Sequence, residues 1–211
     1  MKELIKLLLN EELTKIAGDT MHFWHGGNLD EIKSIVAHKK GRHEFGAGLY
    51  LTTSYNVVED YIKGSRKLYY VVVKKGIDIN KSTLDKKDVD TFVNTYVVGR
   101  KKNDINSRLS KYIKDDKISA SVFNNIMLDG AITSSNTDKL RQFLVDNGID
   151  YELIDGAFGW SGEQMMVLYD MDNKISHTEI KGGFKGLTNF LKELLNKESL
   201  NTEDYNLKNT Y

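Results

Sequence analysis

Residues 45–52 read FGAGLYLT, two glycines that lead into a short strand predicted at 49–52. Glycine lets a backbone approach a ligand closely, and Tyr50 projects from the predicted strand. Tyr61 follows eleven residues later, on a helix predicted at 56–63. The two rings can face one another across a flat ligand, where aromatic stacking would hold it. They can also be core residues with satisfied hydroxyl groups, and this stretch alone favours that interpretation.

A second segment, residues 23–27, reads FWHGG and runs from a predicted strand into two glycines. A flat carboxamide needs one donor and one acceptor, and such a glycine-rich backbone edge offers both. A third segment, residues 158–164, reads FGWSGEQ and precedes a buried strand predicted at 165–169. Phe158 and Trp160 are large aromatic residues on a loop, a placement typical of contact with a ligand or partner. The Glu163 carboxylate then lies at the start of the strand, where the alternative is a solvated strand end.

Taken together in this order, the segments resemble the ADP-ribosyltransferase fold. The likeness is to the branch with a His-Tyr-Glu triad, shared by poly(ADP-ribose) polymerases and diphtheria-type toxins. Residues 23–27 resemble its first-strand HG element, and residues 45–52 resemble its FGxGxYx strand. The eleven-residue step to Tyr61 matches the step to the triad tyrosine. The strand at 165–170, with Glu163 or Gln164 before it, is similar to the third element.

The resemblance implies NAD+ as co-substrate and gives each residue a role. His25 would hydrogen-bond the adenosine ribose, and Gly26 would clamp the nicotinamide carboxamide. Tyr61 and Tyr50 would stack on the two sides of nicotinamide. Glu163 would accept a hydrogen bond from the 2′-hydroxyl of the nicotinamide ribose and stabilise the positive charge that develops when the glycosidic bond breaks. The implied catalytic residues are His25, Tyr61 and Glu163, and the implied NAD+-binding residues are His25, Gly26, Gly27, Gly48, Tyr50, Leu51, Thr52 and Tyr61.

Two positions depart from the family's pattern. Val58 stands three residues before Tyr61, where the polymerases usually have a serine that bonds the carboxamide. The catalytic acid falls one or two residues after Glu163 when the last strand is aligned by its end, so Gln164 competes with Glu163 for that role.

The resemblance implies a mono-ADP-ribosyltransferase of the bacterial or phage toxin or effector type. Its acceptor would be a macromolecule, RNA, DNA or protein, and an antitoxin or inhibitor protein is a further expected partner. Acceptor contacts are expected from the loop at 155–162 and its border, through Phe158, Trp160, Ser161 and Gln164. Two alternatives stay open. One is an RNA 2′-phosphotransferase-like enzyme, which would grip phosphate with arginines, and the other is an inactive module that binds ADP-ribose or NAD+.

The amino-acid composition excludes several classes of catalytic and metal-binding site. The 211 residues include no cysteine, which excludes disulfides, thiolate metal sites and a cysteine nucleophile. The five histidines form no zinc-protease pair, and the sequence has neither a GxxxxGK[ST] phosphate loop nor a GxSxG elbow. We therefore expect no metal. No stretch of about 18 apolar residues and no signal peptide is present, so we expect a cytoplasmic protein without a membrane contact.

The net charge of zero conceals an asymmetry. Residues 63–117 contain 15 basic and 7 acidic residues, and the rest of the chain carries the opposite excess of 8. A basic segment can attract nucleic acid. No nucleic-acid-binding module accompanies it, so solvated helix faces are the favoured explanation.

The periodicity predicts an α+β protein with strands toward both ends of the chain and helices between them. We expect one domain over 1–211, with an N-terminal amphipathic helix at 1–17, a helical insertion at 85–147 and a C-terminal helix and tail at 184–211. The resemblance adds a split β-sheet core. The remaining expected strands are 21–25, 68–73 and 151–154, and the remaining helices are 29–37, 85–97, 105–114, 119–127 and 137–147.

Overall fold

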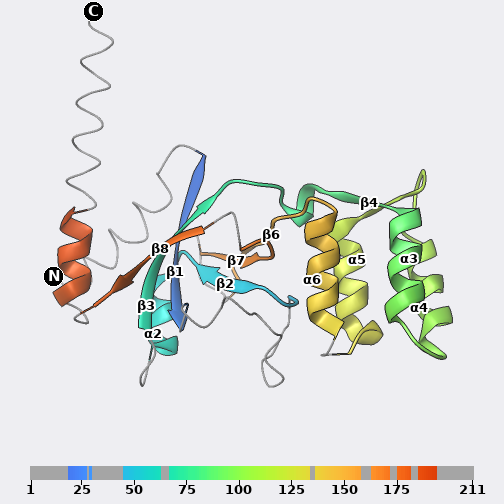
Figure 1. The fold of residues 1–211 in the computed structure, drawn as a ribbon, viewed down its shortest axis with the longest axis horizontal. Helices are drawn as coiled ribbons and strands as arrows, with labels where there is room; N and C mark the ends of the chain where they lie inside the picture. The colour runs from blue at the N-terminus through green and yellow to red at the C-terminus, as the bar shows by residue number, and fades with distance from the viewer. Residues whose placement is uncertain are drawn as a thin grey trace, which may run out of the picture.

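The computed structural model describes residues 19–27, 29, 45–62, 67–133, 136–157, 163–171, 175–181 and 185–193. They form a mixed α+β fold with a mostly antiparallel sheet, so the expected fold class is confirmed (Figure 1). The helix predicted at 1–17, nearly all of the helix predicted at 29–37, and the chain after residue 193 lie outside the described residues.

Six strands form the main sheet, in the order β6-β7-β2-β1-β3-β8, and all neighbouring strands run antiparallel. Five of them confirm predicted strands, and β3 shows why: its sequence KLYYVVVK is rich in β-branched and aromatic residues. Edge strand β8 was not predicted, because three of its residues are exposed and its apolar pattern is weak. The bounds are β1 Thr20–Gly27, β2 Leu49–Thr52, β3 Lys67–Lys74, β6 Tyr151–Asp155, β7 Gln164–Leu168 and β8 Ile175–Ile180.

The sheet has a weak joint between β1 and β2. Strand β1 pairs with β3 along its whole length, and all four residues of β2 pair with β7. Between β1 and β2, in contrast, the described residues form a single register pair, Trp24 with Thr52. The six strands therefore divide into two three-stranded halves, β6-β7-β2 and β1-β3-β8, and we call the line between them the seam.

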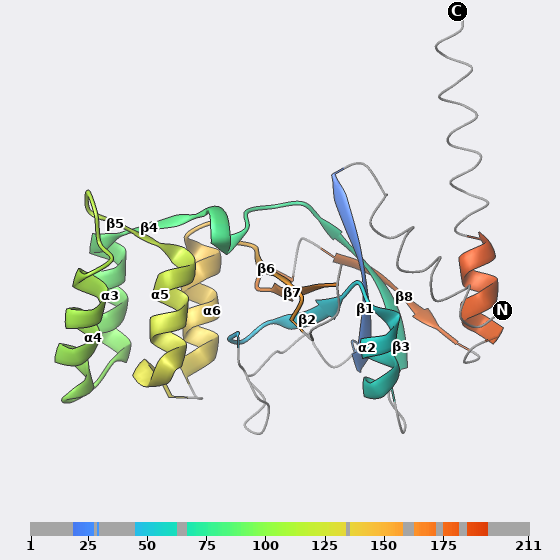
Figure 2. The ribbon, with the colours of Figure 1, turned by 180° about the vertical axis from the view of Figure 1, so that it is seen from behind.

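Helices occupy the chain between β3 and β6 and gather at one end of the molecule (Figures 1 and 2). In both views α5 and α6 lie nearer the sheet, and α3 and α4 lie farther out. A two-stranded antiparallel ribbon, β4 with β5, leads into α3 at one end and into α5 at the other, and the sequence did not predict it. The bounds are η2 Ile79–Lys81, β4 Thr83–Asp85, α3 Lys86–Tyr96, α4 Lys101–Ser110, β5 Lys117–Ser119, α5 Ala120–Ile126, η3 Met127–Ala131 and α6 Thr137–Asp146.

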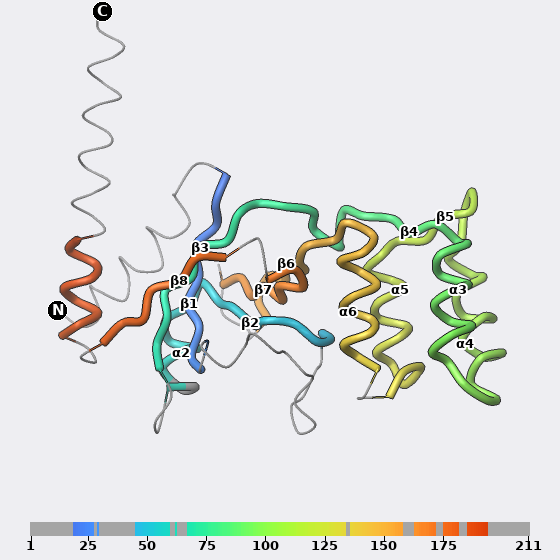
Figure 3. Tube along the Cα trace, viewed as in Figure 1, coloured from blue at the N-terminus to red at the C-terminus, as the bar shows by residue number. Residues whose placement is uncertain are grey.

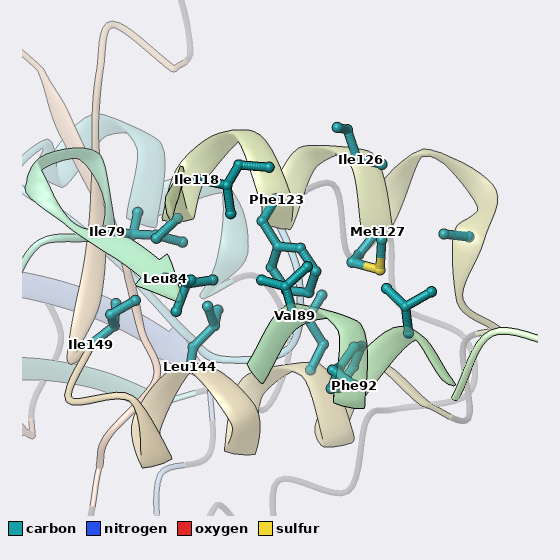
Figure 4. Packing of buried hydrophobic residues seen from close by; sticks show 14 of the residues in the cluster. Ile79, Leu84, Val89, Phe92, Ile118, Phe123, Ile126, Met127, Leu144 and Ile149 are labelled. Atoms are coloured by element: carbon teal, nitrogen blue, oxygen red, sulfur yellow. The ribbon is translucent and has the colours of Figure 1, made fainter. Parts of the chain in front are cut away.

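The helices share one apolar core with the sheet. Phe123 of α5 makes an edge contact with Phe92 of α3, at a ring distance of 5.8 Å, and α6 contributes Leu144 to the same cluster (Figure 4). Met165 and Val167 of β7 belong to this cluster as well. One continuous hydrophobic core therefore contains residues of both the helices and the sheet. The helical region packs against the sheet and does not form a separate core.

Two further clusters cover the sheet. One contains Phe23, Leu51 and Met166 and crosses the seam from β1 to β2 and β7. The other lies under α2 (Tyr55–Tyr61) and a helix over 185–193, which contributes Leu187. Figure 3 traces the backbone of these two helices. The predicted C-terminal helix is thus confirmed in its described part. None of the helices in the described residues combines the length and apolar character needed to cross a membrane.

Candidate active site

The described parts of the three segments that stood out in the sequence, residues 23–27, 45–52 and 163–164, lie on strands β1, β2 and β7 or directly before β2 or β7. The backbone of Thr53 donates to the Gln164 carbonyl at 3.0 Å, and the Gln164 amide donates back to the Thr53 hydroxyl at 3.0 Å. These bonds extend the β2–β7 pairing by one residue. Glu163 is therefore held beside the end of β2, although 111 residues separate Glu163 from Thr52.

Glu163 is a buried carboxylate with only one satisfied oxygen. Its side chain is 4% exposed, and the Thr52 hydroxyl donates to Oε1 at 3.2 Å. Oε2 is buried and has no hydrogen-bond partner among the described residues. Burial raises the pKa of the Glu163 carboxyl above its ordinary value, and the Thr52 hydrogen bond offsets part of that rise. A buried acceptor without a donor is unfavourable for folding alone, so this oxygen is suited to a ligand hydroxyl.

Gln164, the competing candidate, points elsewhere. Its amide Nε2 donates to Asp155 Oδ1 at 2.8 Å in an exposed contact. Successive strand residues face opposite ways, so only one of the two side chains can face Thr52. The structure gives that position to Glu163.

His25 lies on β1 and forms a hydrogen bond across the seam to β2. Its Nδ1 donates to the Tyr50 carbonyl at 2.9 Å, which joins β1 to β2 beyond their single register pair. Because a carbonyl only accepts, Nδ1 carries the proton, and Nε2 of the neutral ring is an acceptor. Burial lowers the pKa of His25 below its ordinary value of 6.5, which keeps the ring neutral at pH 7. Gly27 is needed here, since a methyl group on its Cα would overlap Nε2 of the ring.

The glycines of residues 45–52 have structural tasks. Gly46 has a φ of +95°, a conformation that glycine adopts without strain. A Cβ on Gly48 would lie 2.7 Å from Val167 Cγ1 and 2.8 Å from the Leu168 carbonyl oxygen, so β2 and β7 pack closely only because the residue is glycine. Leu51 is a core residue, 1% exposed. Contact of Gly48 or Leu51 with NAD+ remains a prediction.

Tyr50 is satisfied within the protein. Its hydroxyl donates to the Gly46 carbonyl at 2.8 Å, and its half-buried ring packs against the helical core cluster. The structure thus supplies the core role that the sequence had favoured for this stretch, and stacking on nicotinamide remains a prediction. Tyr61 ends α2, a helix that packs on β1 and β2, but its side chain is outside the described set.

Val58 explains one departure from the family's pattern. It is 2% exposed and lies in the cluster beneath α2, so its position faces the core. Gly26 is half-buried near the end of β1, where its backbone pairs with Leu68 of β3. The predicted acceptor residues Phe158, Trp160 and Ser161 lie outside the described residues.

The sequence missed two further polar groups near the seam. Among the described residues, Trp24 Nε1 and Asn56 Oδ1 are buried without a hydrogen-bond partner, one beside Thr52 in the sheet and the other in the first turn of α2. Trp24 lies beside Thr52 only because β1 pairs with β2, so no local pattern could have indicated this placement. Within the described residues no group of three or more His, Asp or Glu side chains is placed to hold a metal ion.

Two side-chain hydrogen bonds lie at or next to the seam: His25 of β1 bonds the Tyr50 carbonyl of β2, and Thr52 of β2 bonds Glu163, which directly precedes β7. No protein-family model matches the chain, and no curated protein and no solved structure matches it either.

Proposed function

We propose that the protein is an NAD+-dependent mono-ADP-ribosyltransferase, which releases nicotinamide and transfers ADP-ribose to a macromolecule. The observation that carries the proposal is the buried Glu163 carboxylate, held through Oε1 and unsatisfied at Oε2. The residues present fit the nicotinamide ribose, because its 2′-hydroxyl is the donor that Oε2 lacks.

The reaction breaks the bond between the ribose C1′ and the nicotinamide nitrogen, and the bonding electrons leave with nicotinamide. Positive charge then develops on the ribose, and the acceptor nucleophile forms the new bond to C1′ and releases its proton. A carboxylate fixed beside the 2′-hydroxyl stabilises that charge as it appears. Removing such a group costs on the order of a hundredfold in rate, or about 3 kcal/mol.

His25 and Gly26 support the binding part of the proposal. The neutral His25 ring offers Nε2 as an acceptor for a hydroxyl of the adenosine ribose. Gly26 follows directly and offers a backbone without a side chain in the way. The division of the sheet at the seam further supports the split-sheet core that the resemblance implies.

The phosphotransferase alternative is weaker because two of the described arginines, Arg141 and Arg108, are engaged in contacts within the protein. Arg141 donates to the Tyr169 carbonyl at 2.8 Å and to Asp138, and Arg108 pairs with Asp129 at 2.8 Å. An inactive binding module would not need an ionisable side chain in so buried a place, since burial of a carboxylate is costly.

Nicotinamide release from NAD+ tests the proposal. We expect wild-type protein, given separate pools of protein, RNA and DNA with labelled NAD+, to release nicotinamide and to label one pool. Glu163→Gln and Glu163→Ala should each lose about a hundredfold in rate. Gln164→Ala is the matched control, because its side chain bonds Asp155, and it should keep the rate of release within a few-fold of wild type.

Absence of nicotinamide release by wild-type protein with any pool would overturn the enzyme proposal and leave the binding module. Loss of activity in Gln164→Ala with full activity in Glu163→Gln would move the catalytic acid to Gln164. The labelled pool would identify the acceptor class, which decides between a nucleic-acid and a protein target for the expected toxin or effector role.

A further inference from the structure

The Thr52 hydroxyl is fixed by two hydrogen bonds with opposite roles. The Ser54 backbone amide donates to Thr52 Oγ1 at 3.0 Å, and Oγ1 donates to Glu163 Oε1 at 3.2 Å. A hydroxyl has one proton to donate. Since the Ser54 amide can only donate, the Thr52 proton is free to point at the Glu163 carboxylate. The two hydrogen bonds together fix the orientation of the hydroxyl group.

The backbone of Thr52 is fixed as well. Thr52 pairs with Trp24 of β1 and with Met165 of β7, and no other described residue of β2 pairs with both neighbouring strands. The residue is 5% exposed, and a β-branched side chain has few rotamers. Thr52 is therefore a rigid point at the seam, from which a side chain can orient another group.

Glu163 needs such a point. The only hydrogen-bond donor to its carboxylate among the described residues is the Thr52 hydroxyl. A carboxylate turns about its terminal torsion, whose preferences are broad. Without Thr52, nothing described would decide which oxygen faces the ligand, or in which plane.

We propose that Thr52 is a positioning residue, which fixes the rotation of the Glu163 carboxylate by holding Oε1 and so presents Oε2 to a ribose hydroxyl of the substrate. The inference rests on the proposed function. It changes the role of Thr52 from contact with NAD+ to orientation of the group that acts on NAD+. The geometry is preorganised before substrate binds, the condition under which electrostatic stabilisation is most effective.

Steady-state kinetics of Thr52→Val and Thr52→Ser tests the role. Valine keeps the shape and removes the hydroxyl, so we expect kcat for nicotinamide release to fall about tenfold or more, because a hydrogen bond to a charged group is lost. The KM for NAD+ should stay within about twofold, since the lost interaction matters mainly in the transition state. Thr52→Ser keeps the donor and should retain most of kcat. Thr178→Val, an exposed threonine on β8, is the matched control and should behave as wild type.

A double-mutant cycle distinguishes loss of the Glu163 carboxylate orientation from a general structural effect of the Thr52 substitution. In a Glu163→Gln background, Thr52→Val should lower the residual rate far less than in wild type, because the oriented carboxylate is already gone. If Thr52→Val does not fold, Thr52→Ala takes its place, as it adds no methyl group against Met165. Equal loss in both backgrounds, a rise in KM alone, or loss of kcat in Thr52→Ser would each overturn the positioning role.

Failure of the inference and failure of the proposed function give different results. An active wild type with an unaffected Thr52→Val overturns only the role of Thr52. A wild type that never releases nicotinamide overturns the proposed function, and the positioning role with it. The contact itself is then tested by thermal unfolding, in which the Thr52→Val and Glu163→Gln effects should be non-additive if the hydrogen bond exists.

Discussion

At the scale of single residues, the structure keeps an ionisable group where folding would prefer an apolar one. Glu163 is almost fully buried, and half of its hydrogen-bonding capacity is unused. Such groups persist where function requires them and cost stability. We therefore expect Glu163 to lower the free energy of unfolding and to be necessary for the activity. One substitution of Glu163 can test both expectations.

Glu163→Gln should stabilise the folded protein at pH 7 while it lowers the rate of NAD+ consumption about a hundredfold. Glutamine keeps the acceptor for Thr52 and removes the buried charge, although its amide then lacks an acceptor. We expect a gain of about 1 kcal/mol, roughly 2–4 °C in Tm for a chain of this length. Thermal unfolding by circular dichroism measures it. A lower Tm than wild type would show that the carboxylate contributes to stability, contrary to this reasoning.

The stability gain expected for Glu163→Gln should depend on pH, and the pKa shift of Glu163 gives the direction of that dependence. The pKa of Glu163 is raised in the folded state, so the folded protein binds more protons than the unfolded chain just above the ordinary pKa of 4.5. The contribution of Glu163 to the free energy of unfolding is thus greatest below that value. It falls as the pH rises through the folded-state pKa of Glu163. The Tm difference between Glu163→Gln and wild type should grow over this window. Glu152, whose carboxyl pKa burial also raises, is present in both proteins and cancels.

Residue types were easier to predict than residue partners. The sequence indicated His25, Glu163 and the glycines, because their local patterns are unusual. It did not indicate that Thr52 contacts Glu163 or that Tyr50 bonds Gly46, since hydroxyl partners depend on rotamers and on strands brought together from afar.

At the scale of elements, the approach of β2 to β7 is set by one glycine. Gly48 lies against Val167 and the backbone of Leu168, where there is no room for a Cβ. The two strands otherwise pair in full register, from Leu49 with Leu168 to Thr52 with Met165. The position of Glu163 beside Thr52 depends on this register, so the glycine acts on the site through the strand.

Gly48→Ala should destabilise the protein by about 1–3 kcal/mol, the usual cost of forcing extra atoms into a packed interior. Urea unfolding followed by circular dichroism measures the change. Because the methyl group would push β2 from β7, nicotinamide release should fall as well. A wild-type unfolding midpoint would mean that the strands separate at no cost and that close packing at Gly48 is not required.

Elements with strong local signals were predicted well. The bounds of β2 agree with the prediction, and α6 ends within one residue of its predicted end, followed by Gly148 with a φ of +76°. Ser54 stands at the N-cap of α2, but its side chain makes no capping bond. The β4–β5 ribbon and β8 were missed, because each depends on a partner strand more than on its own composition.

At the scale of the whole molecule, the core couples helices to the sheet. Phe123 is fully buried among residues of α3, α6 and β7. The hydrophobic pattern indicated helices between two groups of strands, but it held no information on how they pack. The charge asymmetry was less informative, since some described cations of the basic segment form ion pairs within the protein, Lys67 with Glu179 and Arg108 with Asp129.

Phe123→Ala should destabilise the whole protein by about 3–5 kcal/mol, the usual cost of a large cavity. Trp24 is buried in the sheet and reports on it by fluorescence once Trp160 is replaced by Phe. We expect Trp24 fluorescence and helical circular dichroism to report the same lowered Tm. Val98→Ala, an exposed apolar position on the same helical region, should change little. An unchanged Trp24 transition would show that the helices unfold independently.

The seam has a mechanical consequence. Backbone hydrogen bonds are directional and resist shear, whereas apolar contacts are non-directional and tolerate small sliding. Between the two halves of the sheet there is one register pair, and the rest of the described joint is the bond from His25 and the side chains of the cluster that crosses it. The joint is therefore the compliant part of an otherwise stiff sheet. Its width can adjust to what lies across it, while each half keeps its own groups in register.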